Sequence, residues 1–247
     1  MHSFDKAEYD VRVDRVRARV AQQGFDLLIT CNPANMNYLT GYDGWSFYTP
    51  QIVAVAQQED EPICIVRGID RAGGFVTTHL SEENMLGYPD HYVQAEDIHP
   101  MDWIGGLLVE RGLGKGRVAV DMDAYYYSAR AHAALEAAMP DATFVDAANL
   151  VNWVRVIKSP REIAYMREAA KLVELAMQAG IDAIEPGTRQ CDAVADIYNA
   201  QIRGTGDFGG EYTSIVPMLP TGVGTTTPHL TWNSEPFQHG EATILEL

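Results

Sequence analysis

The chain has 247 residues, which is enough for one large domain or two domains of modest size. Hydrophobic residues make up 47% of the sequence, so the chain can fill a core, and this composition excludes a disordered protein. Thirty-four acidic residues against 18 basic ones give a net charge of −16, and no basic patch interrupts the acidity, so we expect no nucleic-acid partner.

Helical and strand patterns are mixed over roughly the first 150 residues. Ser3 can cap a first helix that ends at Gly24, and the apolar stripe of this helix consists of Tyr9, Val13, Val16 and Val20. Buried strands are predicted at residues 25–30, 52–56, 63–66, 118–121 and 143–145, and helices at residues 101–111 and 126–138. This mixture predicts an α/β domain.

A strong helix signal begins at Lys158. Ser159 can cap the helix, Pro160 suits its first position, and Glu162 completes an S-x-x-E capping box. Apolar residues follow at helical spacing, at Ile163, Met166, Ala170, Val173 and Met177. We expect the domain boundary at this point, with a first domain at residues 1–157 and a second at residues 158–247.

A second helix of the later domain is expected from about Thr188 to Gly204. One of its faces carries Cys191, Val194, Tyr198 and Ile202. The last residues, ATILEL at 242–247, have a strand pattern and stop without a turn signal or a polar tail. Either they form a terminal edge strand, or the chain is a fragment of a longer protein.

The three cysteines, Cys31, Cys64 and Cys191, lie far apart and form no C-x-x-C motif. This spacing argues against a disulfide scaffold or a zinc ribbon and favours a reducing compartment. The polar amino terminus is unlike a signal peptide, and no apolar run approaches the roughly 18 residues that a membrane span needs. We therefore expect a soluble, cytoplasmic protein with no membrane partner.

Two side chains near the end of the chain are candidates for acid–base chemistry. Glu246 falls inside the apolar strand pattern, where burying a carboxylate is costly unless a positive group meets it. His229 follows a segment rich in Gly and Thr, and a histidine beside such an acid is a candidate proton shuttle because histidine titrates near working pH. Taken alone, His229 also fits a structural histidine, and Glu246 also fits a solvated strand face.

Three motifs resemble a known family. They are K-S-P-R-E-I-A-Y-M-R-E-A-A at residues 158–170, P-H-L-T-W-N at 228–233 and G-E-A-T-I-L-E-L at 240–247. Together they resemble the creatinase/methionine-aminopeptidase superfamily. The resemblance implies an α/β creatinase-like amino-terminal domain followed by an α+β "pita-bread" catalytic domain, of which this chain holds the first part.

The position of Glu246 bears on the question of a metal. In the metallopeptidases of this superfamily, a metal-binding Asp follows a His, and the same spacing of 17 residues leads from His229 to Glu246. Creatinase, a member without metal, also has Glu in place of this Asp. The resemblance therefore implies an enzyme with no metal ion and no other cofactor, whose second active-site carboxylate lies beyond Leu247.

Further blocks resemble the ectoine hydrolase branch of the superfamily. They are N-P-A-N-M-N-Y-L-T-G-Y-D-G-W-S-F-Y at residues 32–48, G-Y-P-D-H-Y-V-Q at 87–94, H-P-M-D at 99–102, F-V-D-A-A-N-L-V-N-W at 144–153 and G-G-E-Y at 209–212. Enzymes of this branch open the cyclic amidine ring of the osmolyte ectoine. The resemblance implies this small molecule as the substrate and N-acetyl-2,4-diaminobutyrate as the product of C–N bond hydrolysis.

The resemblance also assigns roles within the second domain. His229 would act as general acid and base, and Glu246 would hold the N–H groups of the amidinium by charge-assisted hydrogen bonds. The expected substrate-binding residues are Glu211, Tyr212 and Trp232. Taken alone, Glu211 and Tyr212 also fit ordinary loop residues.

Three aromatic residues of the first domain, Trp45, Phe47 and Tyr48, are further candidates for substrate binding. The loop that carries them resembles the creatinase loop that lends an aromatic residue to the partner subunit's active site. This implies a homodimer in which Phe47 reaches across, although the three residues also fit core aromatics. Thr49 stands where creatinase has an arginine that grips the carboxylate of creatine, which counts against creatine as the substrate.

Two other functions fit the same motifs. A metal-dependent Xaa-Pro dipeptidase is the nearest enzyme alternative, because Glu can bind a metal ion as Asp does. The other alternative is a pita-bread domain that has lost catalysis and binds peptides or proteins.

Overall fold

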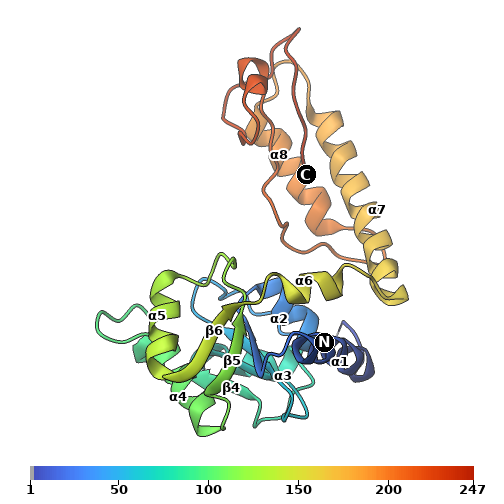
Figure 1. Cartoon of the computed structure of the whole chain (residues 1–247). Helices are drawn as coiled ribbons and strands as arrows, with labels where there is room; N and C mark the ends of the chain where they lie inside the picture. The colour runs from blue at the N-terminus through green and yellow to red at the C-terminus, as the bar shows by residue number, and fades with distance from the viewer. Residues whose placement is uncertain (1–2) are drawn as a thin grey trace. The chain divides into compact units, whose positions relative to one another are not determined.

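The computed structural model describes residues 3–247, which form two compact units (Figure 1). The first unit ends at Ile157, and the second consists of Lys158–Leu247. Among the described residues, no helix is both long enough and apolar enough to cross a membrane.

The first unit is built on a six-stranded sheet with the order β4-β3-β2-β1-β5-β6. β2 runs antiparallel to β1 and β3, and the other neighbouring pairs are parallel. The strands are β1 Leu27–Thr30, β2 Ile52–Ala56, β3 Ile63–Arg67, β4 Met85–Tyr88, β5 Lys115–Val120 and β6 Asp141–Asp146. Every residue of β1 and β2 is buried, as expected for central strands that are covered on both faces.

Helices cover both faces of this sheet (Figure 1). Their bounds are α1 Lys6–Gln22, α2 Pro33–Thr40, α3 Arg71–Thr77, α4 Pro100–Glu110, α5 Ala129–Ala138 and α6 Leu150–Arg155, with short 3₁₀ helices η1 Gly68–Asp70 and η2 Asp90–Tyr92. α4 and α5 contribute to the buried cluster on one face, and α1, α2 and α6 contribute to the cluster on the other. The predicted α/β organisation is confirmed.

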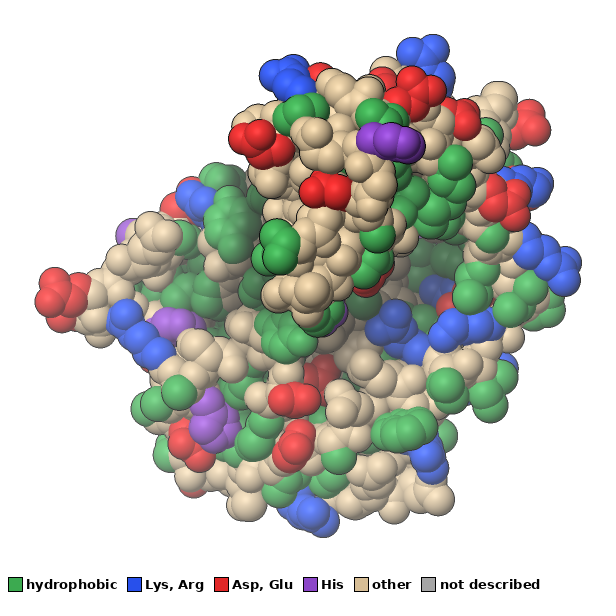
Figure 2. Space-filling view, turned by 90° about the horizontal axis from the view of Figure 1, so that it is seen from above, with side chains coloured by type: hydrophobic (Ala, Val, Ile, Leu, Met, Phe, Trp, Pro, Cys, Tyr) green, Lys and Arg blue, Asp and Glu red, His purple; other side chains and the backbone are tan. Residues whose placement is uncertain are grey.

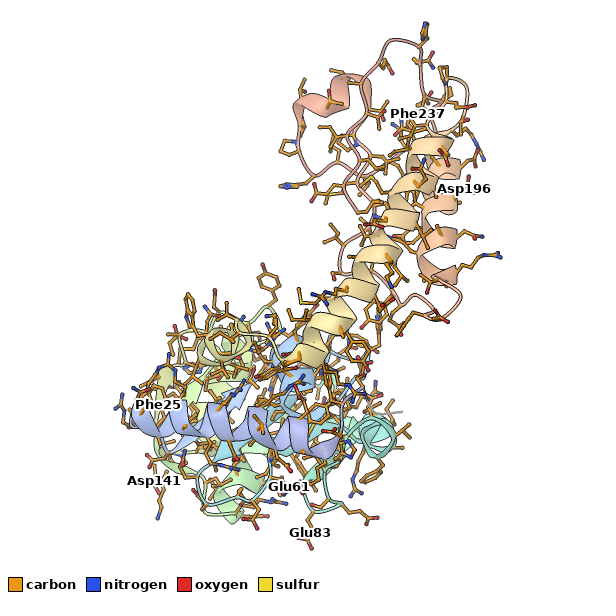
Figure 3. The ribbon with its side chains drawn as sticks, turned by 90° about the vertical axis from the view of Figure 1, so that its right-hand side faces the viewer. Phe25, Glu61, Glu83, Asp141, Asp196 and Phe237 are labelled. Carbon is orange, nitrogen blue, oxygen red and sulfur yellow. The ribbon has the colours of Figure 1, made fainter. Side chains whose placement is uncertain are left out.

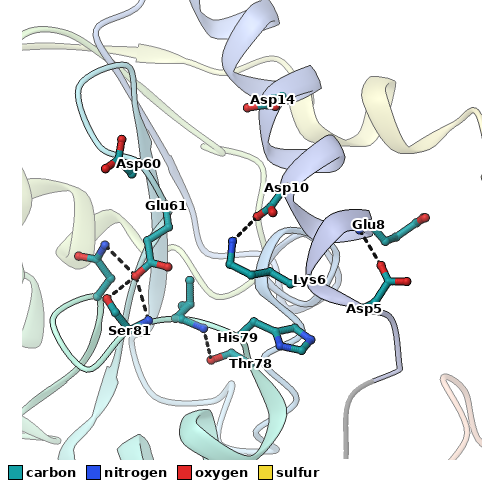
Figure 4. Close-up of polar contacts among 12 residues, drawn as sticks. Asp5, Lys6, Glu8, Asp10, Asp14, Asp60, Glu61, Thr78, His79 and Ser81 are labelled. Atoms are coloured by element: carbon teal, nitrogen blue, oxygen red, sulfur yellow. Dashed lines mark hydrogen bonds and ion pairs between the residues drawn. The ribbon is translucent and has the colours of Figure 1, made fainter.

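The predicted first helix is correct in its buried face but not in its start. Asp5, and not Ser3, is the N-cap of α1, and its Oδ1 accepts a hydrogen bond of 2.9 Å from the backbone N–H of Glu8 (Figure 4). An exposed ion pair of 2.7 Å joins Lys6 to Asp10 in the same turn of the helix. The predicted apolar stripe is buried, at Tyr9, Val13, Val16 and Val20.

Several elements of the first unit have no counterpart in the sequence prediction, namely α2, α3, α6, β4 and the two 3₁₀ helices. α2 begins at Pro33 after the N-cap Asn32 and ends at Gly41, whose φ of +82° places it in the left-handed region. It covers only eight residues, and polar residues interrupt its apolar ones, so it has no clear periodicity. β4 has only four residues and contains Gly87, and a glycine in a sequence pattern indicates a turn more often than a strand.

The second unit begins with two helices that lie side by side, α7 Pro160–Ala183 and α8 Gln190–Arg203 (Figure 1). The predicted capping box of α7 is confirmed: the Ser159 N–H donates to Glu162 Oε2 at 2.7 Å, and the Glu162 N–H donates to Ser159 Oγ at 3.2 Å. Phe237 lies beside these helices and completes a small buried cluster with Ala193 and Ile197 (Figure 3).

The face of α8 that packs agrees with the predicted one at Val194 and Tyr198 but not at Cys191 and Ile202. Its buried residues are Gln190, Ala193, Val194, Ile197 and Gln201, whereas Ile202 is exposed and Cys191 is only partly buried. Ile197 packs closely on α7 at Gly180, where an added Cβ would lie 3.1 Å from Cδ1 of Ile197.

The predicted apolar stripe of α7 is largely exposed within this unit. Ile163, Met166 and Val173 are all exposed, and only Ala176 and Gly180 of this helix are buried. Figure 2 shows hydrophobic side chains, in green, on one face of the molecular surface among acidic and basic ones. Residues 158–247 therefore leave much of this helix uncovered.

Candidate active site

The strand expected at residues 242–247 pairs antiparallel with residues 218–222. The Glu246 N–H donates to the carbonyl of Met218 at 3.1 Å, the Met218 N–H donates back to the carbonyl of Glu246 at 2.9 Å, and the Ile244 N–H donates to Pro220 at 3.1 Å. Leu245 packs against the buried cluster of this unit, while Ile244 and Glu246 are exposed. Glu246 thus lies on the outer face of a backbone-paired strand, next to an apolar side chain.

His229 lies in a turn that follows the 3₁₀ helix η3, Gly222–Thr226. Hydroxyl groups close this helix, because Thr225 Oγ1 donates to the carbonyl of Gly222 and Thr226 Oγ1 to that of Val223, each at 2.8 Å. The backbone of His229 has a φ of +65°, in the left-handed region that few residues other than glycine adopt. The imidazole is exposed, at a backbone position of the kind that functional sites often use.

Glu211 and Tyr212 follow a tight turn after α8. The N–H of Gly210 donates to the carbonyl of Ile202 at 3.0 Å, and a Cβ added at Gly210 would lie 1.6 Å from the carbonyl oxygen of Gln201. Only glycine fits at this close approach. Gly210 therefore fixes the loop that follows α8 against the last turn of that helix, directly before Glu211 and Tyr212.

A groove of about 560 Å³ brings Glu211 and Tyr212 together with Leu247, the neighbour of Glu246. Its other walls come from α7, including Tyr165 and Leu172, and from the α8 end at Gln201. The Gln201 side chain is buried, and its Oε1 has no hydrogen-bond partner among residues 3–247. The sequence prediction missed Gln201, because a buried glutamine has no distinctive signal in a helical pattern.

Trp232 faces the helices of the second unit. Its ring meets that of Tyr198 edge to face, with centroids 6.5 Å apart and an interplanar angle of 78°. The next backbone N–H, at Asn233, donates to Gln190 Oε1 at 3.2 Å and attaches this segment to the start of α8. Trp232 is thus partly buried against the cluster that holds the two helices together.

The three aromatic candidates of the first unit form one cluster at the edge where β1, β3 and β5 end. Trp45 and Tyr48 are each 60% exposed, and Phe47 is partly buried. The Trp45 ring lies 5.2 Å from Phe47 and 6.0 Å from Tyr48, between centroids. Thr49 is buried and donates its hydroxyl to the carbonyl of Ser46 at 2.9 Å, so it serves the turn itself.

A buried carboxylate at the same edge of the sheet was not anticipated. Asp121 Oδ2 accepts hydrogen bonds from the Thr30 hydroxyl and from Asn35 Nδ2, the latter at 3.1 Å. Burial raises the pKa of Asp121, the two hydrogen bonds lower it, and nearby Asp146 raises it. Arg155 of α6 donates to Asn35 Oδ1 at 2.7 Å, so the network attaches α6 to the sheet.

The metal question can be tested on the side chains present. Among residues 3–247, no three His, Cys, Asp or Glu side chains come close enough together to hold a metal ion. His229 and Glu246 alone do not make a metal site.

Comparison with known proteins identifies the family to which each unit is similar. Residues 12–157 match the model of the creatinase/prolidase N-terminal domain, and residues 164–247 match metallopeptidase family M24. An ectoine hydrolase from Halomonas elongata is 45% identical over 99% of this chain and 62% of its own length, and an uncharacterized hydrolase/peptidase, y4tM, from Sinorhizobium fredii is 47% identical over 92% of this chain and 58% of its own length.

The fold matches solved structures of dipeptidases. An Xaa-Pro dipeptidase from Bacillus anthracis superposes with a TM-score of 0.72 at 18% identity, over 96% of this chain and 60% of that one. At this identity the likeness shows the fold alone, and it confirms the predicted succession of a creatinase-like domain and part of a pita-bread domain. The chain spans about three fifths of the length of these relatives.

Proposed function

The chain belongs to the creatinase/prolidase superfamily, and we propose that it is the amino-terminal part of a hydrolase that opens the ring of ectoine. The observation that carries the proposal is the 45% identity to an ectoine hydrolase over 99% of the chain. Residues 1–157 are the creatinase-like domain in this proposal, and residues 158–247 are the first part of the catalytic domain.

The proposed reaction is hydrolysis of an amidine. Water adds to the amidine carbon, and the bond from this carbon to one ring nitrogen breaks. The carbon keeps its other nitrogen and becomes the carbonyl of an N-acetyl group, while the released nitrogen leaves as an amine. His229 takes a proton from the attacking water and returns it to the leaving nitrogen, as one general acid and base can do in sequence.

Glu246 holds the substrate in this proposal. Ectoine carries a positively charged amidinium whose N–H groups are donors, and a carboxylate is the natural acceptor for such donors. Two observations support this role: backbone hydrogen bonds fix the strand of Glu246, and its carboxylate shares a face with Ile244. Glu211, Tyr212 and Trp232 complete the substrate contacts in the proposal.

We further propose that the complete enzyme is a homodimer in which Phe47 reaches the partner subunit's active site. The exposure of Trp45 and Tyr48 around it supports this role, because soluble domains rarely expose a cluster of large rings without a partner.

We also propose that the enzyme works in a reducing compartment such as the cytoplasm, since Cys31, Cys64 and Cys191 are all free thiols.

The decisive experiment uses the complete reading frame of the longer protein. We expect it to hydrolyse ectoine and to keep its activity in the presence of a chelator, whereas residues 1–247 alone turn over negligibly. His229→Ala should lower kcat by about 10²–10⁴-fold, as the loss of a general acid and base does. His239→Ala, which removes another exposed histidine of the same unit, is the matched control and should leave kcat unchanged.

Two results would decide for the alternatives. Stoichiometric bound zinc, manganese or cobalt, together with chelator-sensitive cleavage of Xaa-Pro dipeptides, would assign the protein to the metallopeptidases. Absence of turnover on both substrates, with retained binding of peptides, would assign it to the non-catalytic modules.

A further inference from the structure

We propose that Tyr126 is a positioning residue that, together with Trp45, holds Phe47 in the orientation required for its role; this inference rests on the function proposed above. Tyr126 follows β5, about 80 residues after Phe47 in the sequence, and none of the motifs that carry the family resemblance includes it. The assignment comes from ring packing at the edge of the sheet.

Phe47 lies between two rings. Its centroid is 5.2 Å from that of Trp45, at an interplanar angle of 57°, and 5.1 Å from that of Tyr126, at 55°. Both distances fall in the range of roughly 4.5–7 Å in which tilted aromatic pairs attract each other. Among the described residues, Tyr126 is the one ring contact of this cluster that comes from outside residues 45–48.

The segment that carries Tyr126 is fixed to the core. The backbone turns twice, with the Ala124 N–H donating to the carbonyl of Asp121 at 3.1 Å and the Tyr127 N–H donating to Ala124 at 3.0 Å. Tyr127 is itself buried, and its hydroxyl lies 2.8 Å from Nδ1 of His132. Tyr126 is therefore held on a rigid support, with 40% of its surface exposed.

The segment that carries Phe47 is a closed turn without regular secondary structure. Residues 41–51 form no helix or strand, and the Thr49 N–H closes a turn by donating to the carbonyl of Ser46 at 2.9 Å. Gly44 packs directly on the buried Tyr42, because an added Cβ would lie only 2.1 Å from the Tyr42 hydroxyl. These contacts fix the backbone of the turn, and the rings of Trp45 and Tyr126 contact the Phe47 side chain that projects from it.

The expected effect is on binding and not on chemistry. An aromatic pair contributes about two- to twelvefold to an equilibrium constant beyond the burial of its area. In the complete protein, Tyr126→Ala should raise KM for ectoine by about this factor and leave kcat nearly unchanged, because Phe47 touches substrate without taking part in proton transfer. Tyr126→Phe should restore the wild-type KM, since the contact uses the ring and not the hydroxyl.

The test is a double-mutant cycle with a control. If Tyr126 acts through Phe47, the Tyr126→Ala/Phe47→Ala protein should bind no worse than Phe47→Ala. Tyr125→Ala is the matched control, because Tyr125 is the preceding residue, is 98% exposed and has no ring contact among the described residues. Additive effects of the two substitutions, or equal damage from Tyr126→Phe and Tyr126→Ala, would overturn the inference.

A second measurement separates this inference from the proposed function. In protein with labelled phenylalanine, the ring resonances of Phe47 should shift in Tyr126→Ala and in Tyr126→Leu, but not in Tyr125→Ala, with no ectoine present. A protein that hydrolyses no ectoine but shows these shifts would refute the function and leave the packing role. Unchanged Phe47 resonances in both Tyr126 variants would refute the packing role itself.

Discussion

Replacement of Gly210 by alanine should displace the segment that carries Glu211 and Tyr212. The new Cβ would lie 1.6 Å from the carbonyl oxygen of Gln201 and 2.6 Å from its carbonyl carbon. Real Cβ atoms do not come closer than 3.0 Å to such atoms, so the two backbone segments must separate by roughly 1.4 Å. The hydrogen bond of 3.0 Å from the Gly210 N–H to Ile202 cannot survive that movement unchanged.

The magnitude follows from these two losses. Overpacking of a tight contact costs about 1–3 kcal/mol, and the weakened hydrogen bond adds about 1 kcal/mol. If Glu211 and Tyr212 contact the substrate as proposed, a displacement of about 1 Å should lower kcat/KM of the complete protein by about 100-fold. Urea unfolding of the 247-residue chain measures the stability, and hydrolysis by the complete protein measures the activity.

Gly209→Ala is the matched control. A Cβ at Gly209 meets nothing within 4 Å, so this substitution should change the free energy of unfolding by no more than about 0.5 kcal/mol. If Gly210→Ala proves as stable and as active as Gly209→Ala, the turn after α8 does not fix the positions of Glu211 and Tyr212, and the reasoning fails.

Two further predictions concern pH. Burial lowers the pKa of His99, assisted by Arg130 and opposed by Asp102, and His99 Nδ1 accepts the Met101 N–H at the start of α4. The stability that this cap contributes is present above about pH 6.5 and is lost as pH falls through the folded-state pKa. His99→Asn should therefore flatten the curve of unfolding free energy against pH in this range. Burial raises the pKa of Asp121, so the contribution of this group to the free energy of unfolding is present below about pH 3.9 and is lost as pH rises through the folded-state pKa. Asp121→Asn should flatten that part of the same curve. An unchanged slope would contradict the raised pKa of Asp121.

Features that depend on neighbouring residues could be predicted from the sequence. The capping box at Ser159 and Glu162 is a short pattern with one geometric solution, so it identified the start of α7 to the residue. The stripe of α1 was correct for a similar reason, because its period of 3.6 residues extends over three turns. The cap of the same helix was misassigned because Ser3 and Asp5 both satisfy the N-cap preference.

Features that depend on distant residues could not be predicted in this way. Ile197 of α8 packs on Gly180 of α7, a contact between two helices that the pattern of either helix alone does not specify. The contact between Phe47 and Tyr126 joins two loops that meet only because β5 lies two strands away from β2 in the sheet. The role of Asp121 likewise depends on Thr30, which the parallel pairing of β1 and β5 brings beside it.

Glu246 and His229 are both exposed, and exposure weakens the attraction between Glu246 and a positively charged substrate. Two opposite charges 4 Å apart attract with about 1 kcal/mol in bulk water, but with about 4 kcal/mol where surrounding protein lowers the effective dielectric constant to about 20. On the open face that residues 158–247 present, Glu246 would therefore hold an amidinium little better than solvent does. In the proposed mechanism, Glu246 therefore needs cover over the face that it shares with Ile244 to hold the amidinium more strongly than water does.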